Sequence, residues 1–334
     1  MKVAVYGASG HTGRFVIAEL LRRGHAAIAI GRDPVALAAS VPRDAAAVET
    51  RAAALDSAAS LDRALRGAAA VINCAGPFLD TARPVIEAAL RARIHYIDVT
   101  AEQASATATL DGCDRPARER GICIVPAAGF YGGLGDVLAT AAMGDWTSAD
   151  SVDLAIALDS WHPTRGTRTT GERNTAPRLV FAQGTLRPIE PAEAAPRAFA
   201  PPFGEQSMVE VPLTEAILLA RHLRVRDIRN FINAAPLRDL ENAATPPPIA
   251  TDERGRSDQQ FLFEVDVRRG DDVRGIGVRG RDIYAATAPI VVEAVEQMFA
   301  PRGAAIGALT LAQLVDAPSF LNALVRDGHL AMVE

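Results

Sequence analysis

The sequence begins with a short apolar segment that runs directly into a glycine-rich turn. Residues 3–6 have the composition of a buried strand, and residues 14–23 favour a helix. The turn between them carries Gly7, Gly10 and Gly13. A strand, a glycine turn and a helix in this order are typical of a dinucleotide site, because the helix N-terminus offers free N–H groups and a positive dipole end to phosphates.

Each glycine of this turn has its own expected role. Gly7 permits the tight turn, Gly10 lets the backbone approach a pyrophosphate, and Gly13 lets the helix pack close to the strand. The spacing G-x-x-G-x-x-G is a variant of the usual fingerprint, and a plain strand-to-helix turn is the alternative interpretation. The cofactor-binding residues expected here are Gly7, Ser9, Gly10, His11, Thr12 and Gly13.

Length and charge limit the class of protein. The chain has 334 residues, of which 49% are hydrophobic, so two domains with sizeable cores are expected. A net charge of −5 argues against binding to nucleic acids or anionic membranes, and the apolar runs are too short for a membrane span. A small-molecule substrate is the expected partner.

The cysteines and histidines indicate a reducing compartment and no metal site. Three cysteines without clustering favour the cytoplasm, and Met1-Lys2 before the first strand leaves no room for a signal peptide. The six histidines have no i, i+4 pair, so no metal site is expected.

Two patterns of elements divide the chain. Residues 1–148 alternate apolar strands with helices, which predicts an α/β fold with a doubly wound parallel Rossmann sheet. Residues 149–282 predict an α+β domain on a mixed or antiparallel sheet, for substrate binding and dimerisation. Its expected strands are 151–161, 261–267 and 273–280, and its expected surface loops are 186–206 and 245–259.

The residues after the second strand indicate which nicotinamide cofactor would bind. A NAD-binding unit carries an acidic residue at the end of this strand, where the sequence instead has Gly31 and Arg32. Arg32 could hold a 2′-phosphate, so NADP(H) is preferred over NAD(H). Alternatively Arg32 is solvated and Asp33 caps the next helix. Asp56 could contact the adenine or cap a helix.

With these motifs in place, the chain resembles the saccharopine dehydrogenase-like family, which includes saccharopine reductases and trans-acting enoyl reductases. The resemblance rests on residues 7–13, on Ile72-Asn-Cys-Ala-Gly-Pro-Phe78 and on His95-Tyr-Ile-Asp-Val-Thr-Ala-Glu102. It implies a Rossmann domain with an inserted mixed-sheet domain, and it implies that about 283–334 return to the cofactor domain. Because the family is chemically diverse, the resemblance does not give the substrate.

Two of these motifs also have a local interpretation. Ala75, Gly76 and Pro77 place a bare backbone at the carboxyl end of a strand, where a parallel sheet binds its ligand. Asp98 ends the next strand and is expected near the nicotinamide. Glu102 could also face the substrate, or Thr100 to Gln103 could form a capping box that leaves Glu102 as a first-turn carboxylate.

The candidate catalytic residues are Asp98, Tyr131 and His162. Lys2 is the only lysine, which excludes the Tyr–Lys pair of short-chain dehydrogenases. Tyr131 follows the sixth strand, and His162 ends the first strand of the second domain. Arg165 and Arg168 in the following polar loop could hold a substrate carboxylate.

These observations favour an NADP(H)-dependent oxidoreductase that reduces a C=N or C=C bond in a cleft between two domains. A homodimer through the second domain is expected, since its sheet needs a cover. The alternative is a non-catalytic NADP(H)-binding redox sensor or regulator, which the lack of an obvious acid–base pair favours.

Overall fold

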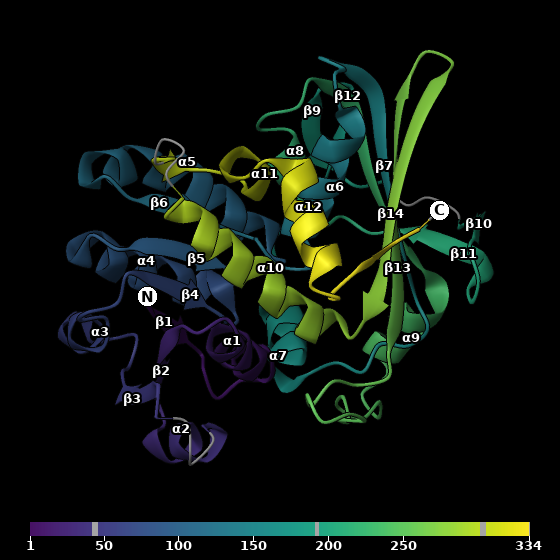
Figure 1. Ribbon diagram of the computed structural model, residues 1–334. Helices are drawn as coiled ribbons and strands as arrows, with labels where there is room; N and C mark the ends of the chain where they lie inside the picture. Colours follow the sequence, from purple (N-terminus) through teal and green to yellow (C-terminus); the bar gives the residue numbers. More distant parts are fainter. Residues whose placement is uncertain (42–45, 191–193, 301–304, 334) are drawn as a thin grey trace.

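The computed structural model describes residues 1–41, 46–190, 194–300 and 305–333, which form two sheets with helices around them (Figure 1). The first sheet is parallel, with the order β15-β6-β5-β4-β1-β2-β3. Its strands are β1 (Lys2–Tyr6), β2 (Ala26–Gly31), β3 (Val48–Ala52), β4 (Ala70–Asn73), β5 (His95–Asp98), β6 (Cys123–Val125) and β15 (Gly307–Ala308).

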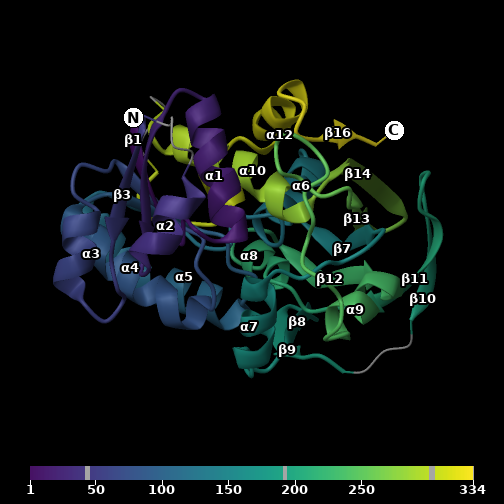
Figure 2. The same ribbon diagram turned by 90° about the horizontal axis from the view of Figure 1, so that it is seen from below.

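Helices cover both faces of this sheet, as the sequence predicts. Successive residues of β1 are buried on opposite faces: Val3 and Val5 join one core cluster, while Ala4 and Tyr6 join another. The helices that pack around the sheet are α1 (His11–Arg22), α2 (Pro34–Ser40), α3 (Ala58–Ala64), α4 (Phe78–Ala92), α5 (Gln103–Arg120) and α10 (Ile283–Met298). Although α10 comes late in the chain, it lies beside α1 (Figure 2).

The second sheet is mixed, since β7 and β12 are parallel and the other pairs are antiparallel. Its main order is β10-β11-β12-β7-β13-β14-β16, and β8 pairs with β12 and β9. The strands are β7 (Ala149–Leu158), β8 (Leu179–Ala182), β9 (Thr185–Pro188), β10 (Ala195–Phe199), β11 (Gly204–Glu210), β12 (Val225–Asn233), β13 (Gln260–Arg269), β14 (Asp272–Arg281) and β16 (Ala331–Met332). Both parts of the expected fold class are therefore confirmed.

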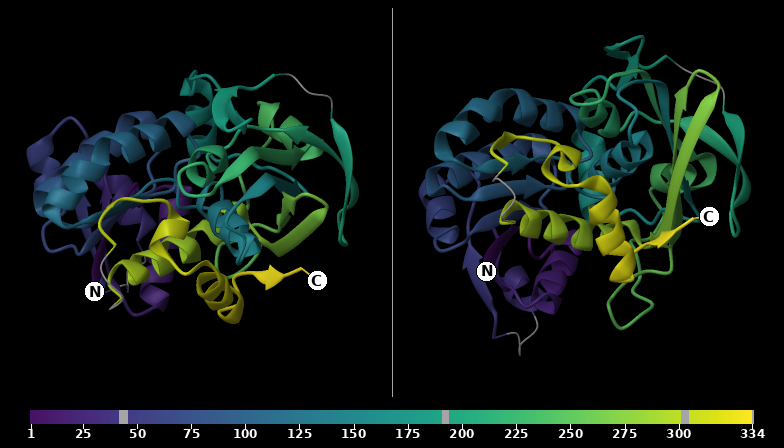
Figure 3. Two further views of the ribbon diagram at one scale, coloured as in Figure 1. Left: turned by 90° about the horizontal axis from the view of Figure 1, so that it is seen from above. Right: turned by 45° about the horizontal axis from the view of Figure 1, so that its top comes forward.

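Further helices join the two sheets (Figure 3). Helix α6 follows β6 of the first sheet and packs against β13 and β14 of the second, and α12 packs against α6. The remaining helices are α6 (Gly133–Met143), α7 (Arg165–Arg173), α8 (Glu215–Leu219), α9 (Ala234–Glu241), α11 (Leu311–Leu314) and α12 (Ala317–Arg326).

The structure corrects the expectation of a surface loop over 186–206. This stretch contributes β9, β10 and the start of β11 to the second sheet, and 191–193 lie outside the described residues. Proline is tolerated at Pro196 because β10 is the edge strand of the sheet and pairs only with β11. The expected loop over 245–259 is confirmed, since this segment contains neither helix nor strand.

Two smaller expectations were wrong. Arg165 and Arg168 lie in helix α7 rather than in a loop, because the Thr164 hydroxyl accepts the Thr167 N–H and caps the helix. The capping box from Thr100 to Gln103 does not form, since α5 begins after Glu102 and the Gln103 amide bonds to backbone groups of β8 and of the segment before α8.

Within the described ranges, no helix has the length and hydropathy needed to cross a bilayer. The same part of the chain holds no cluster of three or more His, Cys, Asp or Glu side chains arranged to bind a metal ion.

Candidate cofactor and substrate cavity

A cavity of about 1240 Å³ lies at the carboxyl ends of the first sheet's central strands and extends to the second sheet. It is lined by the glycine turn before α1, the residues after β2 and β4, every residue of α7, and apolar residues of the second domain. This is where an open parallel sheet binds its ligand, so the cavity is the candidate functional site.

The glycine turn has the geometry of a phosphate-binding turn. Gly7 has a φ of +81°, and a Cβ there would lie 2.9 Å from Ala75. A Cβ on Gly13 would lie 2.3 Å from the Gly7 carbonyl oxygen, so α1 can approach β1 only with glycine at this position. Gly10 is the N-cap of α1, which has neither a capping side chain nor an acidic residue in its first turn. The helix N-terminus is therefore free to face an anion.

The expected cofactor residues of the turn are placed in two ways. Five of them line the cavity, while Gly13 faces the turn itself. The cavity-lining residues are Gly7, Ser9, Gly10, His11 and Thr12.

Arg32 and Asp33 follow β2 at one end of the cavity, and both line it. Asp33 caps α2 by accepting the N–H groups of Val35 and Ala36, so this part of the alternative interpretation is confirmed. Arg32 is exposed, and no hydrogen bond or ion pair holds its side chain within the described residues. The guanidinium is thus available at the end of β2 that would face an adenosine ribose.

Asp56 does not line the cavity. Ser57 caps α3, and its hydroxyl accepts the Ser60 N–H. The pKa of the Tyr6 phenol is raised by burial. The nearby charge of Arg32 lowers this pKa, and the charge of Asp56 raises it.

Ala75, Gly76 and Pro77 all line the cavity after β4. A Cβ on Gly76 would lie 2.6 Å from the hydroxyl of Thr170, so α7 approaches this turn closely. Pro77 is the N-cap of α4 and has no side-chain acceptor to offer. The Glu102 carboxylate fills this role by accepting the N–H groups of Phe78 and Leu79.

Asp98 is fully buried and does not line the cavity. Its carboxylate accepts the backbone N–H groups of Thr100 and Ala127 and the phenol O–H of Tyr96. Burial raises its pKa to about 6. The expected contact with a nicotinamide is therefore not supported by its position, and its bonds instead fix the loops after β5 and β6.

The other two catalytic candidates are separated. His162 does not line the cavity, and its Nδ1 lies 3.2 Å from the carbonyl oxygen of Pro246. Tyr131 does line it, and its ring stacks on Trp161 with centroids 5.6 Å apart. The Tyr131 hydroxyl is buried without a hydrogen-bond partner in the described part of the chain, and burial raises its pKa well above the usual value.

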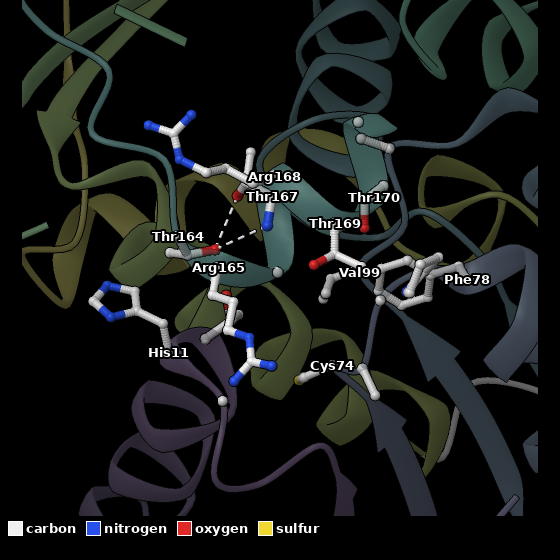
Figure 4. A pocket seen from close by; sticks show the side chains of 18 of the residues that line it. His11, Cys74, Phe78, Val99, Thr164, Arg165, Thr167, Arg168, Thr169 and Thr170 are labelled. Carbon is white, nitrogen blue, oxygen red and sulfur yellow. Dashed lines mark hydrogen bonds between the residues drawn. The ribbon is translucent and has the colours of Figure 1, made fainter. Parts of the chain in front are cut away.

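Helix α7 crosses the cavity without a single buried side chain, and its contacts are polar. Arg168 donates to the carbonyls of Asn242 and Thr245, and Arg173 pairs with Asp80 at 2.5 Å across the two domains. Thr167 bonds to the Tyr284 hydroxyl. In Figure 4 Arg165 extends from α7 into the cavity, away from the direction of Arg168.

Several lining residues were not found from the sequence. The indole N–H of Trp161 donates a hydrogen bond to the hydroxyl of Tyr284, which lies 123 positions later in the sequence. The Tyr284 ring packs edge-on against His11. The residues Asp282, Ile283 and Tyr284, which begin α10, are the sequence signal that could have found Tyr284. The apolar residues on the second-domain side are Val211, Leu213, Ile232, Leu237 and Leu240.

Comparisons with known proteins find relatives of the N-terminal domain and of the whole fold. Residues 3–120 match the family described as "Saccharopine dehydrogenase NADP binding domain". The chain is 28% identical over 146 residues to a saccharopine dehydrogenase-like oxidoreductase of Rattus norvegicus, covering 39% of this chain and 34% of the relative. A Mus musculus relative is 28% identical over 145 residues, covering 38% and 34%. The chain thus spans about a third of the curated relatives that it matches.

The fold as a whole is similar to that of a solved structure, an apo saccharopine dehydrogenase (L-Glu forming) from Saccharomyces cerevisiae. The TM-score is 0.68 with 12% identity, and the match covers 100% of both chains. The similarity to the saccharopine dehydrogenase-like family expected from the sequence is confirmed, and the matched N-terminal domain supports binding of a nicotinamide cofactor.

Proposed function

We propose that this chain, a relative of the saccharopine dehydrogenase-like oxidoreductases, is an NADP(H)-dependent oxidoreductase that reduces a C=N or C=C bond of a small molecule. One observation carries the proposal. A single cavity joins an uncapped helix N-terminus and an arginine that has no partner among the described residues, both on the cofactor side, to aromatic and apolar side chains on the other side. Such a cavity can hold a dinucleotide and a second molecule together.

The preference for NADP(H) rests on Arg32. Asp33 is adjacent, but its carboxylate is engaged by the N–H groups at the start of α2. Asp33 forms no ion pair with Arg32 in the described residues, so the Arg32 guanidinium can make charge-assisted bonds to a 2′-phosphate. The glycine turn and α1 would hold the pyrophosphate.

The cavity residues after β4 would contact the nicotinamide. Ala75, Gly76 and Pro77 present mostly backbone there, and Thr170 of α7 lies across from Gly76. The bound cofactor supplies the hydride, and the protein must orient the substrate and supply a proton. Helix α7 and the second domain would keep water from the site.

Tyr131 is the proton donor that we propose. Its hydroxyl has no partner in the described residues, so a substrate atom would be its hydrogen-bond acceptor. Because burial raises its pKa, the phenol keeps its proton at neutral pH. Asp98 and His162 are outside the cavity lining, and we assign neither a direct role.

Nicotinamide spectroscopy tests the proposal. NADPH fluorescence should change on titration with the protein, and NADPH absorbance should fall when an imine, an enone or a keto acid from a panel is accepted. Tyr131→Phe should then lower kcat with little effect on NADPH affinity. Tight NADPH binding without oxidation by any member of the panel would favour the sensor alternative.

We further propose that the protein is a homodimer through its second domain and acts in the cytoplasm. Twofold assemblies are the commonest oligomers, and the edge strand β10 offers a face for pairing. The three cysteines are unpaired thiols, as a reducing compartment requires. Light scattering at micromolar concentration tests the dimer, and a monomeric mass would contradict it.

A further inference from the structure

The second-domain side of the cavity has an unusual division of surfaces. One wall is apolar and is built from the segment after β11, from β12 and from α9; it consists of Val211, Leu213, Ile232, Leu237 and Leu240, hereafter the apolar wall. Another wall is α7, whose sequence Arg-Gly-Thr-Arg-Thr-Thr-Gly-Glu-Arg holds no apolar side chain. A cavity with both surfaces suits an amphipathic molecule.

The apolar wall is incompletely covered by the protein. Leu237 and Leu240 are only half-buried, and so is Val211. These three side chains pack against the core on one side and line the cavity on the other. Water beside them is displaced at a gain of free energy by any apolar group of suitable shape.

Aromatic rings line the cavity as well. Phe130 packs edge-on against Tyr131, and Tyr131 stacks on Trp161. All three line the cavity together with the apolar wall. An apolar body of a substrate could therefore contact aromatic as well as aliphatic side chains in this cavity.

Of the three arginines of α7, Arg165 is the one available to hold the charged end of such a molecule. Arg168 is already bonded to two backbone carbonyls, and Arg173 is paired with Asp80. Arg165 has no hydrogen bond or ion pair within the described residues, and its side chain extends into the cavity (Figure 4). A guanidinium in this state favours a carboxylate, which it can bind with two parallel hydrogen bonds.

We propose that the substrate is an amphipathic carboxylate: an aliphatic or aromatic body contacts the apolar wall, and its carboxylate is bound by Arg165. That this ligand is a substrate rests on the proposed function. The test of the ligand class is a binding measurement that needs no turnover, so the ligand class and the proposed function can fail separately.

The chain provides its own fluorescent reporter. It has two tryptophans, and Trp161 lines the cavity, whereas Trp146 lies between Arg269 and Arg274 and does not line it. In a Trp146→Phe background, Trp161 emission should report ligands in the cavity alone. Butanoate, hexanoate and octanoate are titrated with saturating NADP⁺ present, and calorimetry repeats each titration.

Affinity should rise about threefold to fourfold for each added methylene, as burial of CH₂ groups predicts. L-Glutamate, which is polar throughout, should bind more weakly than octanoate. An affinity that does not depend on chain length, or tighter binding of glutamate, would overturn the assignment. This comparison uses the unaltered cavity and does not depend on how any cavity variant folds.

Matched variants locate the binding surface. Leu240→Asn should weaken octanoate binding about tenfold, whereas Ile249→Asn should leave it unchanged, since Ile249 is 68% exposed and outside the cavity. Equal effects of the two would mean nonspecific binding and would contradict the proposal.

Arg165→Ala should remove the preference for octanoate over 1-octanol, while Arg115→Ala, at an exposed position of helix α5, should not. Loss of NADPH affinity with octanoate binding intact would instead assign Arg165 to the cofactor and overturn its role here. If octanoate binds as expected but NADPH does not bind at all, the proposed function fails and the ligand class stands.

Discussion

The Glu102 carboxylate accepts the backbone N–H of Phe78 at 2.6 Å and the next N–H, of Leu79, at 3.0 Å. Phe78 begins α4 and Glu102 precedes α5, so one side chain caps a helix that lies 24 positions earlier in the chain. The two motifs that carry the family resemblance beyond the glycine turn are therefore physically joined. These two hydrogen bonds hold the Gly76-Pro77 turn in place at the cavity.

Replacing this cap should cost stability. Glu102→Ala leaves two N–H groups at the start of α4 without an acceptor, so the free energy of unfolding should fall by about 1–3 kcal/mol. Urea denaturation measures this change in the free energy of unfolding. The control is Glu87→Ala, which removes an exposed pair with Arg83 and should cost less than about 0.5 kcal/mol. Similar losses for both variants would refute the capping role.

Local sequence patterns predicted the first sheet well, because its buried strands are apolar runs bounded by turns. The expected strand over 3–6 lies within β1, and the expected helix over 14–23 corresponds to most of α1. Strands β9 and β10 were missed because most of their residues are exposed and each strand contains a proline, which a central strand would not tolerate. Their place in the sheet depends on pairing with distant strands, which periodicity does not record.

The cofactor side of the cavity was predictable for the same reason that its strands were: its residues follow strands of a parallel sheet. The position of Asp98 was not. A carboxylate at a strand end can face the cleft or the backbone of neighbouring loops, and the N–H groups of Thr100 and Ala127 decide this only in the folded chain. Likewise, the apolar wall draws on segments that share no local motif.

Arg32 should discriminate between the two nicotinamide cofactors. Arg32→Ala should weaken NADPH binding by about 1.5–3 kcal/mol, the range for bonds to charged groups, and should leave NADH affinity nearly unchanged. Fluorescence titration of both cofactors measures this, with the exposed Arg66→Ala as control. Equal losses for NADPH and NADH would exclude a 2′-phosphate contact.

Two glycines of one turn should respond differently to substitution. Gly10 has an extended backbone that any residue can adopt, and it lines the cavity. A Cβ there would lie 3.0 Å from the Gly7 carbonyl oxygen, a milder approach than at Gly13, so Gly10→Val should fold with some loss of stability and lose NADPH binding. Gly13→Ala places a Cβ against the Gly7 carbonyl and should lower stability by about 1–3 kcal/mol. Circular dichroism and NADPH titration separate the effects. A folded Gly10→Val protein with normal NADPH affinity would contradict the phosphate site.

Asp98→Asn should act on stability rather than on the cofactor. One oxygen of Asp98 accepts two backbone N–H groups and the other accepts the Tyr96 hydroxyl, and an amide can replace only one of these oxygens. We expect a loss of about 1–2 kcal/mol in the free energy of unfolding, with NADPH affinity unchanged. A variant with normal stability but strongly reduced turnover would restore a catalytic role for Asp98.

Glu215 should make stability fall as pH rises through neutrality. It is fully buried, accepts the Gly132 N–H with one oxygen, and has no partner for the other within the described residues. Burial raises its pKa from 4.5 to about 7, the nearby Asp136 adds to this, and the Gly132 bond opposes it. Asp136 itself is paired with His222.

Because the folded state holds this proton more tightly than the unfolded state, the contribution of Glu215 is fully present below about pH 4.5 and is lost as pH rises through about 7. The total is on the order of 3 kcal/mol. Urea denaturation at pH 5, 6, 7 and 8 should show this decline in the native protein and a smaller decline in Glu215→Gln, whose amide can still accept the Gly132 N–H. Asp98 remains in both proteins and shifts both curves in the same direction, so the difference between them isolates Glu215. Parallel curves would show that Glu215 is ionised in the folded protein throughout this range.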